Sequence, residues 1–192
     1  MKQITILVLF TLLFSFCGSD EETNGNGNNE SPEPKYEANY TSESGMFKCY
    51  FPESFVPEET IKELEGEDGI IELHSFQYKT EDLYYAVKYA DYPKQAMEKY
   101  TQREIMTNVT KGPIVKQGYK ITKEETDLEV DGCPSQVYMW EEYKPDISET
   151  IYIYKKDIFF LNRYYSLVLM RKNGYPTNED IKLYIETFKL TK

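Results

Sequence analysis

The feature that most constrains this fold is an Asp131-Gly132 pair between two strand-like runs, residues 119–130 and 135–143. A two-residue hairpin turn requires positive φ angles, and Asp-Gly is one of the pairs that adopt them readily. The runs on either side carry the aromatic and β-branched residues typical of strands. The sequence therefore predicts an antiparallel hairpin at this point.

Further runs of the same character extend this prediction to a sheet. In the run 83–89, Leu83, Tyr85, Val87 and Tyr89 alternate onto one face. The run 164–171 carries apolar residues on both faces, which is typical of a central strand covered on both sides. It is expected to form a hairpin with the preceding run, residues 148–161, through a turn at Asn162-Arg163. The other expected strands cover residues 46–51, 60–64, 70–78 and 148–161.

Two helices are expected among these strands. The first begins at Asp91-Tyr92-Pro93, runs to about residue 108 and ends before Gly112-Pro113. The second follows Thr177, where Asp180 stands at the capping-box position. Its apolar stripe comprises Ile181, Tyr184, Ile185 and Phe188. Strands, helix, strands and helix in this order predict an α+β domain with a mainly antiparallel sheet.

The N-terminus has the features of an export signal. Lys2 precedes an apolar run over residues 4–16, which has the length of a secretory h-region and is short for a membrane span. Cys17 ends this run, and polar residues follow. The pattern resembles a bacterial lipoprotein signal of the looser Bacteroidetes type, with Phe16 bulkier than the usual residue before the cysteine. We therefore expect cleavage of residues 1–16 and acylation of Cys17, the alternative being ordinary cleavage near residue 19.

Residues 17–35 then read as a tether. They consist mainly of Gly, Asn, Ser, Pro and acidic residues, and such a composition cannot bury a core. The Ser19-Asp20-Glu21-Glu22 stretch resembles the acidic export tag of flavobacterial lipoproteins. It predicts an outer-membrane lipoprotein held by its acyl chains at the cell surface, the alternative being the periplasmic face. The folded domain is expected over residues 36–192.

Charge and cysteine content limit the partners and the cross-links. The chain has 22 basic and 33 acidic residues, with a formal net charge of −11. This charge argues against nucleic acid and anionic lipid surfaces as partners, since both require a basic footprint. Cys49 and Cys133 remain after Cys17, and an exported compartment permits a disulfide between them. Two free buried thiols are equally compatible with their spacing.

An ordered set of short motifs resembles the PsbP-like family. The set comprises Gly45-Met46-Phe47 with Phe51-Pro52, Tyr89-Ala90-Asp91-Tyr92-Pro93, Val130-Asp131-Gly132-Cys133-Pro134, residues 160–167 and Phe188-Lys189-Leu190. The resemblance covers residues 45–191. It implies an α/β/α sandwich around a central antiparallel sheet. It also implies a binding or assembly factor rather than an enzyme, and no metal site of the namesake can be placed on this sequence.

The candidate catalytic and metal-binding residues are few. His74 is the only histidine, and it stands in phase with Ile70, Phe76 and Tyr78. A single histidine among aromatics is more often packed and hydrogen-bonded than catalytic, although a hydrolase using His74 is an alternative. The acidic run over residues 63–68 lacks the spacing of an EF-hand loop. Glu141 and Glu142 are adjacent on a strand and face opposite ways. We assign no catalytic residue, metal or cofactor.

Aromatic stripes offer the best candidate ligand surface. Tyr138, Trp140 and Glu142 share one strand face, and Tyr152 and Tyr154 share another. Exposed aromatic rings would stack on sugars or peptides, whereas a sheet face covered by a helix would bury them. The sequence thus favours a non-catalytic envelope lipoprotein with an unidentified protein partner. The alternative is a glycan- or small-ligand-binding lipoprotein.

Overall fold

The computed structural model describes residues 37–52, 57–66 and 69–191. The expected signal, Cys17 and the tether lie outside these residues, as do two residues of the acidic run, Glu67 and Asp68. The domain expected from residue 36 onward is thus described from residue 37.

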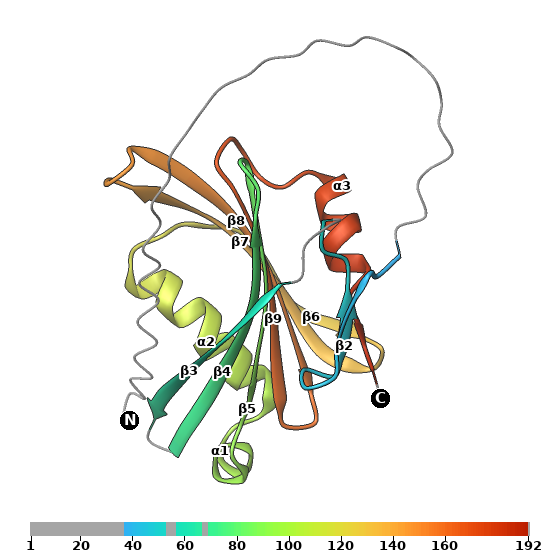
Figure 1. Cartoon of the computed structure of the whole chain (residues 1–192). Coiled ribbons are helices and arrows are strands. Elements are labelled where there is room, and N and C mark those ends of the chain that lie inside the picture. Colours follow the sequence, from blue (N-terminus) through green and yellow to red (C-terminus); the bar gives the residue numbers. More distant parts are fainter. Residues whose placement is uncertain (1–36, 53–56, 67–68, 192) are drawn as a thin grey trace.

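A seven-stranded antiparallel sheet forms the centre of the molecule (Figure 1). Its strands follow the order β3-β4-β5-β9-β8-β7-β6, and each neighbouring pair is antiparallel. The expected α+β class with a mainly antiparallel sheet is therefore confirmed. The strands are β3 (Glu58–Gly66), β4 (Gly69–Lys79), β5 (Leu83–Asp91), β6 (Ile121–Val130), β7 (Cys133–Lys144), β8 (Glu149–Phe160) and β9 (Arg163–Arg171).

The hairpin predicted at Asp131-Gly132 is present. Asp131 and Gly132 have φ angles of 52° and 76°, and Val130 pairs with Cys133 across the turn. Both turn residues thus have the positive φ that a type I′ turn requires. The next hairpin is also present, but its turn lies at Leu161-Asn162, one residue earlier than expected, with Leu161 at φ 57°.

The run 164–171 is the central strand that its two apolar faces predict. It forms most of β9, which has three strands on each side. Tyr165, Leu167 and Leu169 face one core, while Tyr164 and Val168 face the opposite side of the sheet. Both faces of β9 are therefore covered.

A small sheet and the C-terminal helical segment cover one face. The small sheet has the order β1 (Tyr40–Ser42), β2 (Phe47–Cys49) and β10 (Lys189–Leu190). It lies beside α3 (Asn178–Ile181) and the π-helical turn η1 (Lys182–Glu186) (Figure 1). The predicted stripe of this segment is confirmed, because Tyr184, Ile185 and Phe188 are buried in the core and Ile181 packs against it. The π-helical turn was not predicted.

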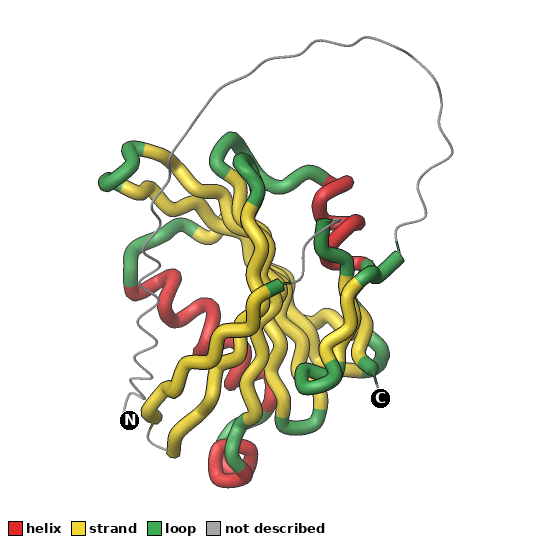
Figure 2. The backbone as a smooth tube through the Cα atoms, viewed as in Figure 1, coloured by secondary structure: helices red, strands yellow, loops and turns green. Residues whose placement is uncertain are grey.

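Helix α2 (Gln102–Lys116) covers part of the other face (Figure 2). The single helix expected over residues 93–108 is wrong, because α1 (Lys94–Lys99) ends before Tyr100 and α2 begins after Thr101. Thr101 and Glu104 form a capping box that starts the second helix. The expected stop before Gly112-Pro113 is also wrong, since Pro113 lies inside α2.

The two cysteines of the domain are not bridged to each other. Cys49 and Cys133 are both buried in the core on the α3 face, and no disulfide joins them. Burial raises the pKa of the Cys49 thiol. Of the two alternatives left open by the sequence, the structure has two buried thiols without a disulfide.

Candidate functional site

A cavity of about 390 Å³ lies between the sheet and α2. Its volume falls within the range of about 300–1,000 Å³ that is usual for sites of small ligands. Most of the lining surface is apolar, and its aliphatic residues come mainly from β4, α2 and β9. They include Ile71, Leu73, Ile105, Val109, Ile114 and Val168. Charged residues line the cavity as well, among them Glu65, Glu142 and Lys144. Such walls favour an apolar guest, since they offer it burial from water.

Small side chains on the central strands leave room for this cavity. Ala90 of β5 and Ser166 of β9 both line it, and both are buried. α1 and α2 span the space above them, so that Ala96 and Ile114 also contribute to the lining. The space therefore lies over short side chains at the middle of a wide sheet.

A buried carboxylate organises the polar side of this region. The side chain of Asp157 in β8 is fully buried. Its Oδ2 accepts hydrogen bonds from Thr110 Oγ1 at 2.6 Å and from Gln136 Nε2 at 2.8 Å. Its Oδ1 accepts one from the Tyr164 hydroxyl at 2.7 Å. These donors fix the carboxylate, because each oxygen has a partner of its own.

Lys155 is the counter-charge of this carboxylate. Its Nζ lies 3.5 Å from Asp157 Oδ1 and donates a hydrogen bond of 2.6 Å to Thr110 Oγ1. It also lies 5.8 Å from the centre of the Tyr164 ring. Burial lowers the pKa of Lys155, and the neighbouring Asp157 opposes that effect. Lys155 also lines the cavity, so one side of this ion pair borders the apolar space.

A second amine, Lys88 of β5, faces the same cavity. Lys88 is only 7% exposed. Burial is the larger cause, and the nearby positive charge of Lys155 is the smaller one; together they lower the pKa of Lys88 to about 7. At neutral pH the charge of Lys88 is therefore sensitive to what occupies the cavity. An anion would favour the protonated amine, and an apolar guest would favour the neutral one.

Ser166 of β9 places a hydroxyl between β5, which carries Lys88, and β8, which carries Lys155. In the sheet it pairs with Lys88 on one side and with Asp157 on the other. Its Oγ is buried near Tyr164 and makes no hydrogen bond of ordinary length and angle among the described residues. A buried hydroxyl without a partner costs stability, and a ligand in the cavity could satisfy it.

The aromatic residues predicted as a ligand surface do not form one exposed platform. Tyr138 and Tyr154 are buried, with Tyr154 in the core on the α3 face. Tyr152 packs edge-on against Tyr175, with ring centres 5.2 Å apart. Trp140 alone of the four lines the α2 cavity. An exposed stacking surface is thus incorrect for Tyr138 and Tyr154, because both faces of the sheet are covered.

His74 lies on the α3 face of the sheet, opposite to this cavity. Its ring stacks on Tyr89 with centres 4.4 Å apart and planes 6° apart. Nδ1 lies 2.8 Å from Glu59 Oε1, and Nε2 lies 3.7 Å from Glu72 Oε2. Both ring nitrogens thus face carboxylates. The arrangement is that of a packed, hydrogen-bonded histidine, and it presents no nucleophile among these contacts.

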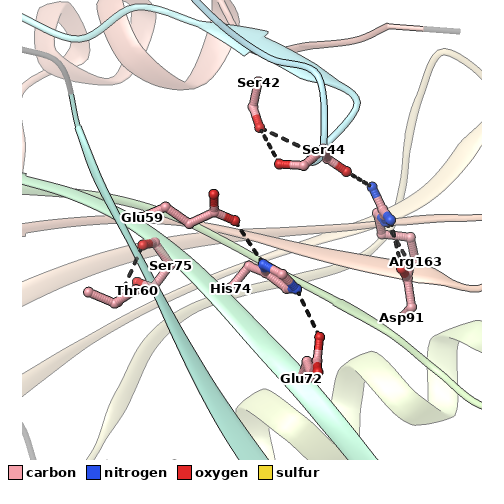
Figure 3. Close-up of polar contacts among 10 residues, drawn as sticks. Ser42, Ser44, Glu59, Thr60, Glu72, His74, Ser75, Asp91 and Arg163 are labelled. Atoms are coloured by element: carbon pink, nitrogen blue, oxygen red, sulfur yellow. Dashed lines mark hydrogen bonds and ion pairs between the residues drawn. The ribbon is translucent and has the colours of Figure 1, made fainter.

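Arg163 continues this cluster and fixes the turn between β1 and β2. Its guanidinium forms two hydrogen bonds of 2.6 Å to the carboxylate of Asp91 and one of 2.7 Å to the Ser44 carbonyl (Figure 3). It also lies 4.6 Å from the centre of the Tyr89 ring. This fork of hydrogen bonds joins the small sheet to the large one. The cluster therefore has a clear structural role.

The polar residues of the cavity were not among the sequence-based candidates. Their signal is a charged residue in an otherwise apolar strand: Lys88 in β5, and Lys155 with Asp157 in β8. Such positions are rarely charged in a central strand without a partner or a function. The cavity itself requires α2 to be placed over the sheet, which no local pattern specifies.

Comparisons with known proteins identify no family for this chain. No family model matches it, and no curated protein matches it. Among solved structures, a protein of unknown function from Pseudomonas aeruginosa is 12% identical, with a TM-score of 0.32. The match covers 74% of this chain and 83% of that one. The fold and the site thus define a class only: an α+β protein with an antiparallel sheet and a cavity beneath one helix.

Two further findings concern membranes and metals. In residues 37–52, 57–66 and 69–191, no helix is long and apolar enough to cross a membrane. Across the same residues, no group of three or more His, Cys, Asp and Glu side chains is arranged to hold a metal ion.

Proposed function

We propose that the domain binds a small, largely apolar molecule in the α2 cavity. The observation that carries this proposal is the cavity itself, a space of about 390 Å³ whose lining surface is mostly apolar and includes several polar and charged side chains. Sites of small ligands share this composition, in which apolar walls supply affinity and a few polar groups set the orientation. The small-ligand alternative raised by the sequence is therefore preferred, at a different site from the one expected.

The same proposal places the domain on an exported lipoprotein. The support is the apolar run over residues 4–16 with Cys17 at its end, followed by the acidic tag at residues 19–22. Acyl chains on Cys17 would hold the domain at the outer membrane, and the tether would separate it from the bilayer. We infer a non-catalytic role and a PsbP-like α/β/α sandwich, which the order of elements and the antiparallel sheet support.

Filling the cavity tests the binding proposal. Trp140, the single tryptophan, lines the cavity and serves as the fluorescent reporter. Titration of the chain with dodecan-1-ol should change the Trp140 emission with a saturating dependence. Ala90→Leu places three extra carbons in the cavity and should abolish this response. Val115→Leu, on the exposed side of α2, is the matched control and should leave it unchanged. A chain that gives no saturable response to dodecan-1-ol would refute the binding proposal.

The lipoprotein proposal has a separate test. In a bacterial host with a lipoprotein pathway, the chain should be labelled by radioactive palmitate and should partition into the detergent phase. Cys17→Ser should remove the label, while Cys133→Ser should retain it. Labelling that survives Cys17→Ser would contradict acylation at this residue.

A protein partner remains a second candidate, favoured by the exposed β3–β4 hairpin. β3 is an edge strand of the large sheet. Ile61 and Ile70 are 59% and 62% exposed and lie on the same face of the hairpin. Exposed apolar residues on an edge strand are typical of an interaction surface. A photo-crosslinker at position 61 should then capture a discrete partner in intact envelopes, and one at position 115 should not.

A further inference from the structure

The polar side chains that line the α2 cavity divide by depth. At the rim, Lys62, Glu63 and Glu65 of β3 and Asn108 and Gln117 of α2 are exposed. Water satisfies these groups, so that they make no demand on a bound molecule. The rim therefore does not decide which ligand the cavity takes.

Other charged groups of the lining are balanced within the protein. Glu142 accepts a hydrogen bond of 2.8 Å from the Tyr119 hydroxyl and forms an ion pair with Lys144. Further in, Lys155 forms its ion pair with Asp157. An ionised ligand would disturb these pairs, and an ion costs more to transfer from water than a neutral polar group does. The lining as a whole thus favours a ligand whose polar end is uncharged.

A row of polar residues crosses the sheet beneath the cavity. The register places Ser75 opposite Lys88, Lys88 opposite Ser166, Ser166 opposite Asp157, and Asp157 opposite Gln136. Residues that are directly opposite in antiparallel strands share one face of the sheet. Apolar clusters flank the row on both sides, one beneath α1 and α2 and the other further along β5, β8 and β9. Lys88 therefore brings an amine into the apolar middle of the α2 face.

The surroundings of Lys88 suit an amine that reacts as a nucleophile. An ordinary lysine is uncharged in only on the order of one molecule in a thousand at neutral pH. Burial and the nearby Lys155 lower the pKa of Lys88 to about 7, so that a large share of its amines are uncharged there. A lysine that is desolvated in an apolar pocket beside a second cation is activated towards carbonyl carbons. Lys88 meets both conditions, and it lines the cavity.

We propose that the ligand is an aliphatic aldehyde, which forms an imine with the Lys88 amine and lays its chain along the apolar walls. This inference rests on the proposed function and names its ligand class. The Lys88 nitrogen bonds to the carbonyl carbon, and the π electrons of the carbonyl move to its oxygen. Both hydrogens of the amine end on that oxygen, which leaves as water while the C=N bond forms. The Ser166 hydroxyl, opposite Lys88 in the register, can accept and donate a proton in this exchange.

The walls suit the chain of such a molecule. Ile71, Leu73, Val109, Ile114 and Val168 line the cavity, and none of them can hydrogen-bond through its side chain. Each methylene buried on these walls should raise the affinity by about three- to fourfold until the cavity is full. A long-chain aldehyde should therefore modify Lys88 at concentrations where butanal does not.

Reductive trapping tests this inference. The full chain carrying Cys17→Ser is incubated at pH 7.5 with dodecanal and sodium cyanoborohydride, which reduces an imine to a stable secondary amine. Peptide mapping by mass spectrometry then locates the dodecyl group. Lys88 should be labelled at least about tenfold more than Lys94, because the amine of an ordinary lysine is almost wholly protonated at this pH. Lys94 is the internal control, with a side chain that is 87% exposed on α1. Saturating dodecan-1-ol should suppress the label at Lys88 and leave that at Lys94 unchanged.

Two variants accompany the mapping. Lys88→Met, with its folding checked by urea denaturation, should lose most of the label, whereas Lys94→Met should keep it. Even labelling of Lys88 and Lys94, or a label at Lys88 that survives saturating dodecan-1-ol, would overturn the inference. No label at Lys88 alongside a saturable Trp140 response to dodecan-1-ol would also overturn it, and would leave the proposed function intact. The absence of both the label and the Trp140 response would overturn the proposed function as well.

Discussion

The amino group of Lys155 lies 3.5 Å from a carboxylate oxygen of Asp157, two residues further along the same strand. Alternation places both side chains on the α2 face of β8. The pair is almost removed from water, with Asp157 fully buried and the Lys155 side chain 13% exposed. A buried ion pair of this kind depends on both partners, because removal of one leaves the other charge without compensation.

Replacement of the carboxylate should therefore destabilise the fold. Asp157→Asn keeps the shape but removes the charge that faces Lys155, and an amide has only one oxygen to accept the bonds from Thr110, Gln136 and Tyr164. We expect the free energy of unfolding, measured by urea denaturation, to fall by about 3 kcal/mol or more. Asp127→Asn, at a side chain that is 93% exposed, should change it by less than about 0.5 kcal/mol. A loss at Asp157 as small as that of the control would contradict the assigned role.

Lys88 should show the opposite behaviour, because its burial opposes folding. Its pKa is about 7 in the folded chain, against an ordinary value of 10.5. Below pH 7 the amine is charged in both states, and the folded state bears the cost of desolvation. Replacement of Lys88 with Met should therefore raise the free energy of unfolding by about 1–4 kcal/mol at pH 6.5, in the absence of ligand.

The pH dependence of this gain has a definite sign. Between pH 7 and 10.5 the unfolded chain binds more protons at Lys88 than the folded chain does, so the stability of the wild type rises with pH. The advantage of Lys88→Met should be constant below pH 7 and should shrink as the pH rises towards 10. Lys155 is the nearby charged group that also lowers this pKa, and it is present in both chains. Urea denaturation of the wild type and of Lys88→Met from pH 6 to 9.5 measures the difference in their free energies of unfolding. A difference that does not change with pH would contradict a buried Lys88 that titrates in this range.

The strands could be predicted because their signals are local. The Asp131-Gly132 turn and the alternation of Tyr85 and Val87 each specify a strand or its end from a few neighbouring residues. The apolar residues on both faces of the run 164–171 likewise predicted a strand at the centre of the sheet. The fold class follows from such local signals in their order.

The cavity could not be predicted in the same way. Lys88, Thr110 and Lys155 are far apart in the chain and meet only after β5, α2 and β8 are assembled. The placement of α2 depended on Thr101, whose capping box with Glu104 divides one expected helix into two. The apolar residues of 93–109 spread widely around a single helical axis, and this loose pattern is what two separate helices produce.

The capping box at Thr101 should contribute measurably to stability. The Thr101 side chain accepts a hydrogen bond from the Glu104 amide, while the Glu104 carboxylate accepts one from the Thr101 amide. Thr101→Ala should lower the free energy of unfolding by about 1 kcal/mol in urea denaturation. Thr101→Ser, which keeps the hydroxyl, should retain most of the stability. Equal losses for Ala and Ser would show that the hydroxyl is not what positions α2.

Two glycines provide a matched test of packing against backbone freedom. A Cβ at Gly45 would lie 2.5 Å from the Phe47 ring and 2.8 Å from Ser42 Oγ, and the Phe47 ring is fully buried. Gly45→Ala should therefore lower the free energy of unfolding by about 1–3 kcal/mol, because the ring has no free space into which to move.

Gly112 lies inside α2, where a Cβ would meet nothing within 4 Å. Gly112→Ala should stabilise the chain by about 0.5–1 kcal/mol, since alanine loses less backbone entropy on folding. Urea denaturation of the two variants should thus give changes of opposite sign. Arg163 joins the turn between β1 and β2 to the large sheet through Ser44. A stabilising Gly45→Ala would show that this turn is packed less tightly than the Gly45–Phe47 contact indicates.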